Sequence, residues 1–228
     1  MSCRSCGHRC VFGFAKRPVP GTVKTRLAAE TSPAWAAAVA AAFLADTLDQ
    51  LASVDARRVL AFAPPDAESY FRDLVIGRFE LTPQRDGDLG QRMAGFFAEQ
   101  FTVGARRIVL VGSDSPTLPR AFVEQAFREL DAADVVLGPA ADGGYYLIGC
   151  SGRMPPLFEG IAWGGAGVLH NTIARLPKKC RLALLPPWYD VDTLDDWQAL
   201  CGHLAALRRA GLPVPVRTNT LATEEPLP

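Results

Sequence analysis

Short apolar runs alternate with longer segments of helical periodicity along most of this chain. The strongest run, Arg107–Val111 (RIVLV), stops at Gly112 and is followed by polar residues. Such a run, closed by a glycine, predicts a buried strand. Repeated strand–helix alternation predicts an α/β domain of three layers around a mixed, mainly parallel sheet. Sheets of this kind bind ligands beyond the carboxyl ends of their strands, so the segments after the strands are the candidate site.

The pattern divides the 228 residues into three parts. Residues 1–9 are predicted to form an N-terminal extension, 10–210 the α/β domain, and 211–228, rich in Pro, Thr and Glu, a loose tail. Strands are expected at 10–15, 59–63, 78–84, 107–111, 134–137, 145–150 and 181–185. Helices are expected at 33–52, 89–101, 119–130, 167–176 and 194–209, the last starting at a Thr193/Asp196 cap.

Charge and hydropathy exclude several classes of partner. Lysine plus arginine and aspartate plus glutamate both number 24, so no overall basic character indicates nucleic acid. No apolar run reaches the roughly 18–20 residues of a membrane span. Charged residues interrupt the N-terminal segment where a signal peptide would be apolar. We therefore expect a cytoplasmic protein; the sequence does not indicate its oligomeric state.

The six cysteines suggest reduced core residues more than a disulfide framework. Cys3, Cys6, His8 and Cys10 are the exception, because Cys-x-x-Cys with a nearby His and Cys can bind zinc. No second Cys pair follows at zinc-finger spacing, and Cys10 begins a predicted buried strand that would turn it away. Zinc binding there remains the less favoured reading.

A cation-rich loop follows the first predicted strand and leads into a helix. It contains Lys16, Gly21, Lys24, Thr25 and Arg26. Backbone N–H groups at a helix N-terminus, with added cations, suit phosphate. The loop is not a Walker A motif, because Val23 stands where that motif needs glycine. An exposed basic loop without function is the alternative.

Carboxylates follow two other segments of the predicted core. Asp114 follows the buried strand 107–111 at its carboxyl end, where it needs a cation; it could bind a divalent metal or cap the next turn. Asp190 and Asp192 precede the last helix, and an extended backbone would point both to the same side. One of them is a second candidate metal ligand.

Two glycine-containing segments complete the candidate site. In the turn after strand 134–137, Asp142 could act as a base, bind sugar hydroxyls or touch the metal, or it could form a plain Asp-Gly turn. Arg92, in a helix opening at Asp88, could reach a base or phosphate, or be a solvated arginine.

Five blocks in order resemble one known family: FAKRPVPGTVKTRLA, DLGQRM, GSDSPTL, LGPAADGGYYLIG and VDTLDDW. They are similar to the bacterial family labelled glycosyltransferases of arsenosugar biosynthesis, formerly a domain of unknown function. That family belongs to the nucleotide-diphospho-sugar transferase superfamily, with the glycosyltransferase A-type fold. It is also similar to 2-phospholactate guanylyltransferases and, more distantly, to sugar-nucleotide cytidylyltransferases. The match spans roughly residues 11–200.

The resemblance implies roles for individual residues. Asp114 resembles the aspartate of a reduced Asp-x-Asp motif whose second position is Pro116, and Asp192 resembles the second magnesium ligand of the cytidylyltransferases. Together they would bind Mg²⁺ or Mn²⁺. Asp142 and Lys24 are the candidate catalytic residues. Nucleotide binding is implied for Lys16, Gly21, Lys24, Thr25, Arg26, Gly90 and Arg92, and acceptor or sugar binding for Gly143, Gly144 and Tyr145.

Three functions remain open at this point. The favoured one is metal-dependent sugar transfer from a nucleotide-diphospho-sugar to a small acceptor. The second is nucleotidyl transfer, in which a nucleoside triphosphate couples to a phosphorylated small molecule and pyrophosphate leaves. The third is a catalytically silent nucleotide-sugar binding protein, against which the intact motifs count.

Overall fold

One seven-stranded sheet organises the chain in the computed structural model, which describes residues 9–224. Its strand order is β3-β2-β1-β4-β6-β5-β7. Only β6 runs antiparallel to its neighbours. The predicted mixed, mainly parallel sheet is thus confirmed. The strands are β1 (Arg9–Lys16), β2 (Arg57–Ala63), β3 (Glu80–Pro83), β4 (Arg107–Val111), β5 (Val135–Pro139), β6 (Tyr145–Ser151) and β7 (Leu182–Leu184).

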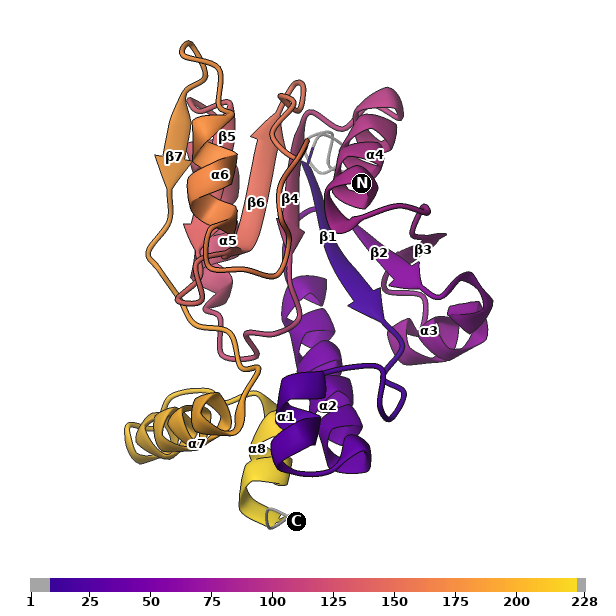
Figure 1. The fold of residues 1–228 in the computed structure, drawn as a ribbon, viewed down its shortest axis with the longest axis vertical. Helices are drawn as coiled ribbons and strands as arrows, with labels where there is room; N and C mark the ends of the chain where they lie inside the picture. Colours follow the sequence, from indigo (N-terminus) through magenta and orange to yellow (C-terminus); the bar gives the residue numbers. More distant parts are fainter. Residues whose placement is uncertain (1–8, 225–228) are drawn as a thin grey trace.

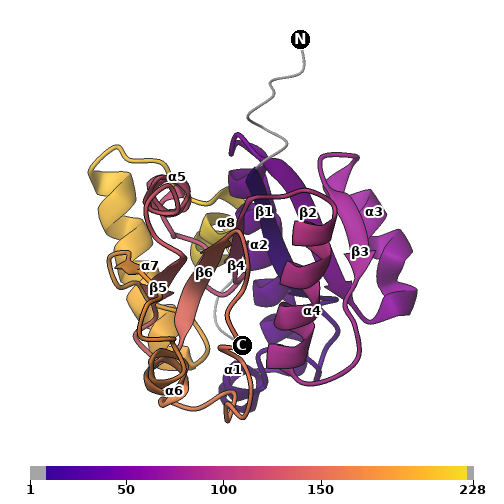
Figure 2. The same ribbon diagram turned by 90° about the horizontal axis from the view of Figure 1, so that it is seen from above.

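Helices cover both faces of this sheet (Figure 2). Alternation along β1 sends Cys10 and Phe12 to one hydrophobic cluster and Val11 and Ala15 to another. The first face packs against α4 (Leu89–Thr102) and α6 (Val168–Ala174). The opposite face packs against α2 (Pro33–Ala52), α3 (Glu68–Val75), which follows the 3-10 turn Pro65–Ala67, and α5 (Arg120–Glu129). This is the three-layer arrangement expected from the alternation.

Helix caps explain why two of the longest helices begin where the sequence predicts. Ser32 accepts a hydrogen bond from the Trp35 backbone N–H at the start of α2. A reciprocal capping box between Thr193 and Asp196 opens α7 (Leu194–Arg209). The sequence did not predict α3, although its Phe71 and Val75 lie four residues apart and are both buried.

A third hydrophobic cluster lies beyond the carboxyl end of β1, where α1 (Thr25–Glu30), α7 and α8 (Val216–Glu224) gather (Figure 1). Trp35 of α2 and Trp197 of α7 meet edge to face in it, with ring centroids 4.9 Å apart. This cluster fixes α1 and the start of α7 against α2. It therefore positions two of the segments that carry candidate site residues.

The prediction of a loose tail from residue 211 is wrong for Val216–Glu224, which form α8. The cause is a buried carboxylate from α2. Asp46 accepts hydrogen bonds from the backbone N–H groups of Arg217 and Thr218 and from the Thr218 hydroxyl. An aspartate from a distant helix thus satisfies the free N–H groups that open α8.

The cysteines of the described residues are free, as expected. Cys10 is fully buried within β1. Cys3, Cys6 and His8 lie outside the described residues. Within residues 9–224, no helix combines the length and apolar character needed to cross a membrane.

Candidate active site

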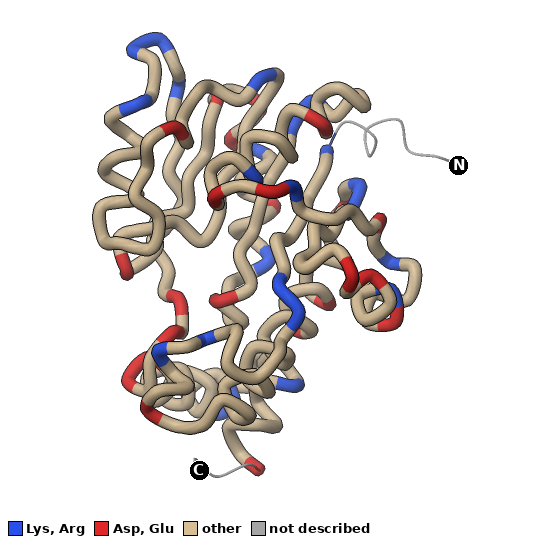
Figure 3. The backbone as a smooth tube through the Cα atoms, turned by 45° about the vertical axis from the view of Figure 1, so that its right-hand side comes forward, with Lys and Arg blue, Asp and Glu red and all other residues tan. Residues whose placement is uncertain are grey.

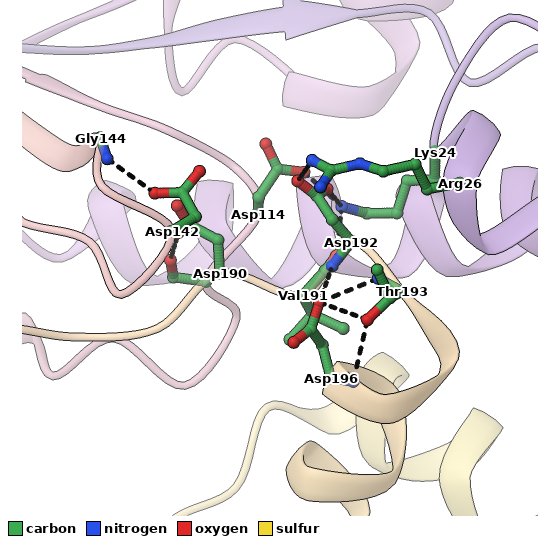
Figure 4. Close-up of polar contacts among 11 residues, drawn as sticks. Lys24, Arg26, Asp114, Asp142, Gly144, Asp190, Val191, Asp192, Thr193 and Asp196 are labelled. Atoms are coloured by element: carbon green, nitrogen blue, oxygen red, sulfur yellow. Dashed lines mark hydrogen bonds and ion pairs between the residues drawn. The ribbon is translucent and has the colours of Figure 1, made fainter. Parts of the chain in front are cut away.

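The ammonium group of Lys24 binds two carboxylates at once beyond the carboxyl end of the sheet (Figure 4). Its Nζ lies 2.5 Å from Asp114 Oδ1, 3.2 Å from Asp192 Oδ1 and 2.7 Å from the Val191 carbonyl oxygen. The Lys24 side chain is only 4% exposed. Arg26 donates to the second oxygen of Asp192 at 2.7 Å. Three segments that lie far apart in the sequence thus meet at the Lys24 ammonium group.

Local backbone structure holds each member of this cluster. Lys24 caps α1 with a left-handed conformation, φ 43°, which is uncommon for a residue with a side chain. Asp114 lies three residues after the end of β4, and its carbonyl oxygen accepts from the Val191 N–H at 3.0 Å. This bond ties the segment before α7 to the end of the central strand. Strained backbone persists where the surrounding structure determines it, which is common at functional sites.

Charge pairing outweighs burial at Lys24. Burial lowers the pKa of the ammonium, but attraction and hydrogen bonding to Asp114 and Asp192 exceed that effect and raise the net pKa above its usual value. Lys24 therefore stays charged. It supplies the cation that the sequence predicted Asp114 to need at the end of a buried strand.

The Asp114 and Asp192 carboxylates also fit a divalent metal ion, provided that the substrate supplies the remaining ligands of the ion. Mg²⁺ and Mn²⁺ prefer carboxylate oxygens and commonly share them with substrate phosphates. Asp114 and Asp192 already converge on one cation, which is the arrangement such an ion needs. Across residues 9–224, no three His, Cys, Asp or Glu side chains form a metal-binding group by themselves. An ion would bind through these two carboxylates and phosphate, and Lys24 would have to leave its present position.

Two cavities meet at this cluster, and Phe14, Leu89, Ser113, Asp114 and Asp192 line both. One cavity, of about 310 Å³, adds Lys16, Lys24 and the first loop, and we call it the basic cavity. The other, of about 360 Å³, lies on the β6 side, and we call it the acidic cavity. Both volumes fall near the lower end of the range for small-molecule sites, roughly 300–1,000 Å³.

Asp142 and Asp190 line the acidic cavity with Asp114 and Asp192. The view in Figure 4 shows Asp142 and Asp190 on the opposite side of Asp114 from Lys24. Burial raises the pKa of Asp190 to about 6; the Ser115 hydroxyl opposes the shift and the negative charges of the other three carboxylates add to it. Asp190 and Asp192, which were expected to point to the same side, both line this cavity.

The turn that carries Asp142 is held by close packing. Asp142 accepts a hydrogen bond from the Gly144 N–H at 2.8 Å. Gly143 has φ 90°, and a Cβ there would lie 2.1 Å from the Ala166 carbonyl oxygen. Gly144 and Tyr145 line the acidic cavity, whereas Gly143 supports the turn. The Tyr145 hydroxyl is buried and has no hydrogen-bond partner within residues 9–224, and burial raises its pKa above the usual range.

Other residues predicted to bind nucleotide line neither cavity. Gly90 is buried, and a Cβ there would lie 2.8 Å from Trp163 and from the Phe158 carbonyl oxygen. Arg92 donates to Gln84 Oε1 at 3.1 Å. Gly21 and Thr25 are exposed, in the first loop and at the start of α1. The structure thus places these four around the cavities, while Lys16, Lys24 and Arg26 line them.

Several residues that line the cavities were not predicted as site residues, and Gln84 and Trp163 are two of them. Gln84 lies in the basic cavity and donates to the carbonyl oxygens of Ala15 and Ala61, at 3.1 and 2.8 Å. Its place at the carboxyl end of the third predicted strand, 78–84, is a signal that could have indicated it. Trp163 lines the acidic cavity. It lies in a glycine-rich segment that no strand directly precedes. Only its run of glycines distinguishes that segment in the sequence.

The sequence profile of one family, DUF2064, described as "Uncharacterized protein conserved in bacteria", matches residues 47–165. The chain belongs to the DUF2064 family. A solved structure from Desulfovibrio desulfuricans G20, a candidate nucleotide-diphospho-sugar transferase, is 35% identical with a TM-score of 0.83. That match covers 89% of this chain and 90% of the other. The resemblance to the nucleotide-diphospho-sugar transferase family, predicted from the sequence motifs, is confirmed. This DUF2064 member is an enzyme of the transferase class.

More distant solved structures share the fold of this DUF2064 member. The Rv0371c homologue from Mycobacterium sp. strain JC1 is 16% identical, covers 90% of this chain and 98% of its own, and has a TM-score of 0.54. The inositol-1-phosphate CTP transferase from T. maritima is 14% identical, with the same coverages and TM-score. No curated protein sequence gives a significant match to the chain.

Proposed function

We propose that this DUF2064 protein transfers a sugar from a nucleotide-diphospho-sugar to the hydroxyl group of a small acceptor. The observation that carries the proposal is the meeting of a basic and an acidic cavity at Asp114 and Asp192. The basic cavity offers Lys16 and Lys24 to a diphosphate. The acidic cavity offers carboxylates that accept hydrogen bonds from hydroxyl groups. The 35% identical candidate nucleotide-diphospho-sugar transferase supports the same assignment.

In this reaction the acceptor oxygen forms a bond to the anomeric carbon of the sugar. The bond between that carbon and the diphosphate oxygen breaks, and the diphosphate leaves with the electron pair. Lys24, with Lys16 and Arg26 beside it, would stabilise the negative charge that develops on the leaving group. Asp142, which lines the acidic cavity, would take the proton from the acceptor hydroxyl. A divalent cation held by Asp114 and Asp192 would supply further charge neutralisation at the diphosphate.

Nucleotidyl transfer is the second candidate. The cation-rich first loop favours it, because Lys16, Lys24 and Arg26 could also bind a triphosphate. In that reaction a substrate phosphate would attack the α-phosphorus and pyrophosphate would leave. Such a substrate would bring its own negative charge into the acidic cavity, so we place sugar transfer first.

A thermal-shift panel tests the proposal. UDP-, GDP-, ADP- and dTDP-sugars are compared with CTP, GTP, UTP and ATP, each with Mg²⁺, Mn²⁺ or EDTA. A ligand at 100 times its dissociation constant stabilises the fold by about 2.7 kcal/mol, which is easily measured. We expect a metal-dependent shift with one diphospho-sugar; a shift confined to a triphosphate would contradict sugar transfer.

Two variants give the panel its control. Asp114→Asn removes one of the carboxylates at the junction of the cavities and should abolish the metal-dependent part of the shift. Asp195→Asn changes an exposed carboxylate in the first turn of α7, so it should bind like the unmodified protein. Equal shifts in both variants would show that Asp114 is not part of the binding site.

A further inference from the structure

The acidic cavity concentrates negative charge in a small volume. Four carboxylates line its 360 Å³, from three separate segments of the chain. Over the whole described backbone, by contrast, acidic and basic residues are interspersed (Figure 3). The charge of this cavity is therefore a local feature that the balanced total of 24 cations and 24 anions conceals. The four are Asp114, Asp142, Asp190 and Asp192.

Arg26 is the one cation among the described residues that line the acidic cavity, and it is already paired. Its guanidinium donates to Asp192 Oδ2 at 2.7 Å. Lys24 is directed to the junction with the basic cavity, where Asp114, Asp192 and the Val191 carbonyl oxygen take its hydrogen bonds. A phosphate or carboxylate on a bound acceptor would thus find no free cation within the cavity lining.

A bound donor and its metal ion would not remove the excess of negative charge in the acidic cavity. A diphosphate brings negative charge to the junction, and a divalent cation at Asp114 and Asp192 would neutralise it there. Asp142 and Asp190 lie on the other side of Asp114 and remain to face the acceptor. Like charges placed in contact weaken binding by about tenfold or more, which is enough to decide between substrates.

Beside Tyr145, Tyr146 and the paired Arg26, most of the remaining lining of the acidic cavity is apolar or small. Phe14, Met93, Leu110 and Trp163 form one part of its wall, and Gly164 and Gly165 leave room beside Trp163. A compact carbon body fits this wall, while its hydroxyl groups can donate to Asp142 and Asp190. The cavity volume leaves space only for small groups.

We propose that the acceptor is a small hydroxyl compound that is uncharged or carries a positive charge, and that phosphorylated or carboxylated acceptors are excluded. This inference rests on the proposed function, because it takes the acidic cavity as the acceptor site. The acidic cavity then selects among acceptors by their charge. Asp142 and Asp190 are the residues that set the selection, by repelling anions and by accepting hydrogen bonds from hydroxyl groups.

Matched pairs of small alcohols test the proposal by binding alone. Glycerol is compared with glycerol 3-phosphate, myo-inositol with inositol 1-phosphate, and ethanolamine with its phosphate ester, by ligand-observed NMR. The protein is first saturated with a nucleoside diphosphate and Mg²⁺, so that phosphate groups cannot enter the basic cavity. We expect the unphosphorylated member of at least one pair to bind about tenfold or more tightly than its phosphate ester. Equal binding of both members in every pair, or tighter binding of the esters, would overturn the proposal.

Charge-removing variants show whether the two carboxylates cause the preference. In the Asp142→Asn/Asp190→Asn double variant, the ratio of affinities within a pair should fall by about tenfold. Asp195→Asn removes an exposed carboxylate outside the cavity and should leave the ratio unchanged. An unchanged ratio in the double variant would overturn the role of these two residues. Because binding is measured without turnover, a failure of sugar transfer itself appears separately, as pyrophosphate release in an activity assay.

Discussion

Lys24 Nζ lies 2.5 Å from Asp114 Oδ1, and it holds this place with a left-handed backbone and a nearly fully buried side chain. The aromatic ring of Phe43, 5.2 Å away, provides a further contact. The ammonium group and a divalent metal would thus compete for the same carboxylates. In the absence of substrate, Lys24 keeps Asp114 and Asp192 together.

Removal of the ammonium should expose this competition. In Lys24→Met the carboxylates lose their cation, and because both are partly exposed we expect a loss of about 1–2 kcal/mol in the free energy of unfolding in EDTA. Mn²⁺ should restore part of that loss. Urea unfolding with Mn²⁺ and with EDTA measures both.

Lys16→Met is the matched control for that experiment. Lys16 is exposed and donates only to the Thr22 carbonyl oxygen, so its loss should change stability by less than about 0.5 kcal/mol. The explanation would be wrong if Mn²⁺ stabilised both variants and the unmodified protein equally.

The buried cap of α8 should be worth a measurable part of the stability. In Asp46→Ala, two backbone N–H groups and the Thr218 hydroxyl lose their acceptor, and we expect a loss of about 1–3 kcal/mol. Amide hydrogen exchange should rise in 216–224 before it rises in the sheet. Exchange that is unchanged in α8 would show that the helix does not depend on Asp46.

The Asp142 turn should not tolerate a side chain at Gly143. Gly143→Ala combines an unfavourable φ of 90° with a 2.1 Å approach to backbone, so we expect a loss of about 2–3 kcal/mol or more, measured by thermal or urea unfolding. Gly202→Ala is the control, because nothing lies within 4 Å of a Cβ at that position of α7. That change should be neutral or stabilise by up to about 1 kcal/mol. Similar effects of the two changes would refute the packing argument.

Burial should protect two cysteines from alkylation. Burial raises the pKa of Cys10 and Cys150 to about 12, so almost no thiolate exists at about pH 8. Iodoacetamide should leave both unmodified in the folded protein and modify both in urea, as read by mass spectrometry of peptides. Rapid modification of either residue under native conditions would contradict its place in the core.

The sequence predicted the sheet because its signals are local. The run at 107–111 and the Thr193/Asp196 pair each specify an element through neighbouring residues. What it could not show depends on distant contacts. The cap of α8 comes from Asp46 in α2, and the cation for Asp114 is Lys24, ninety positions earlier in the chain.

The same limit applies to the candidate site. The family motifs identified Lys24, Asp114 and Asp192, which the structure brings together. Motifs alone could not separate residues that line a cavity, such as Lys16, from those that support it, such as Arg92. Nor could they show that Asp142 and Asp190 share one cavity, because the fold brings them together from separate segments.

The products formed from a nucleotide-diphospho-sugar test the central claim most directly. The protein is incubated with the donor that gives the largest thermal shift, an uncharged alcohol acceptor and Mg²⁺ or Mn²⁺, and phosphorus products are followed by ³¹P NMR. Our account predicts a nucleoside diphosphate, formed together with a glycosylated acceptor and lost in Asp114→Asn. Pyrophosphate formed from a nucleoside triphosphate and a phosphorylated substrate, with no nucleoside diphosphate from any donor, would contradict it.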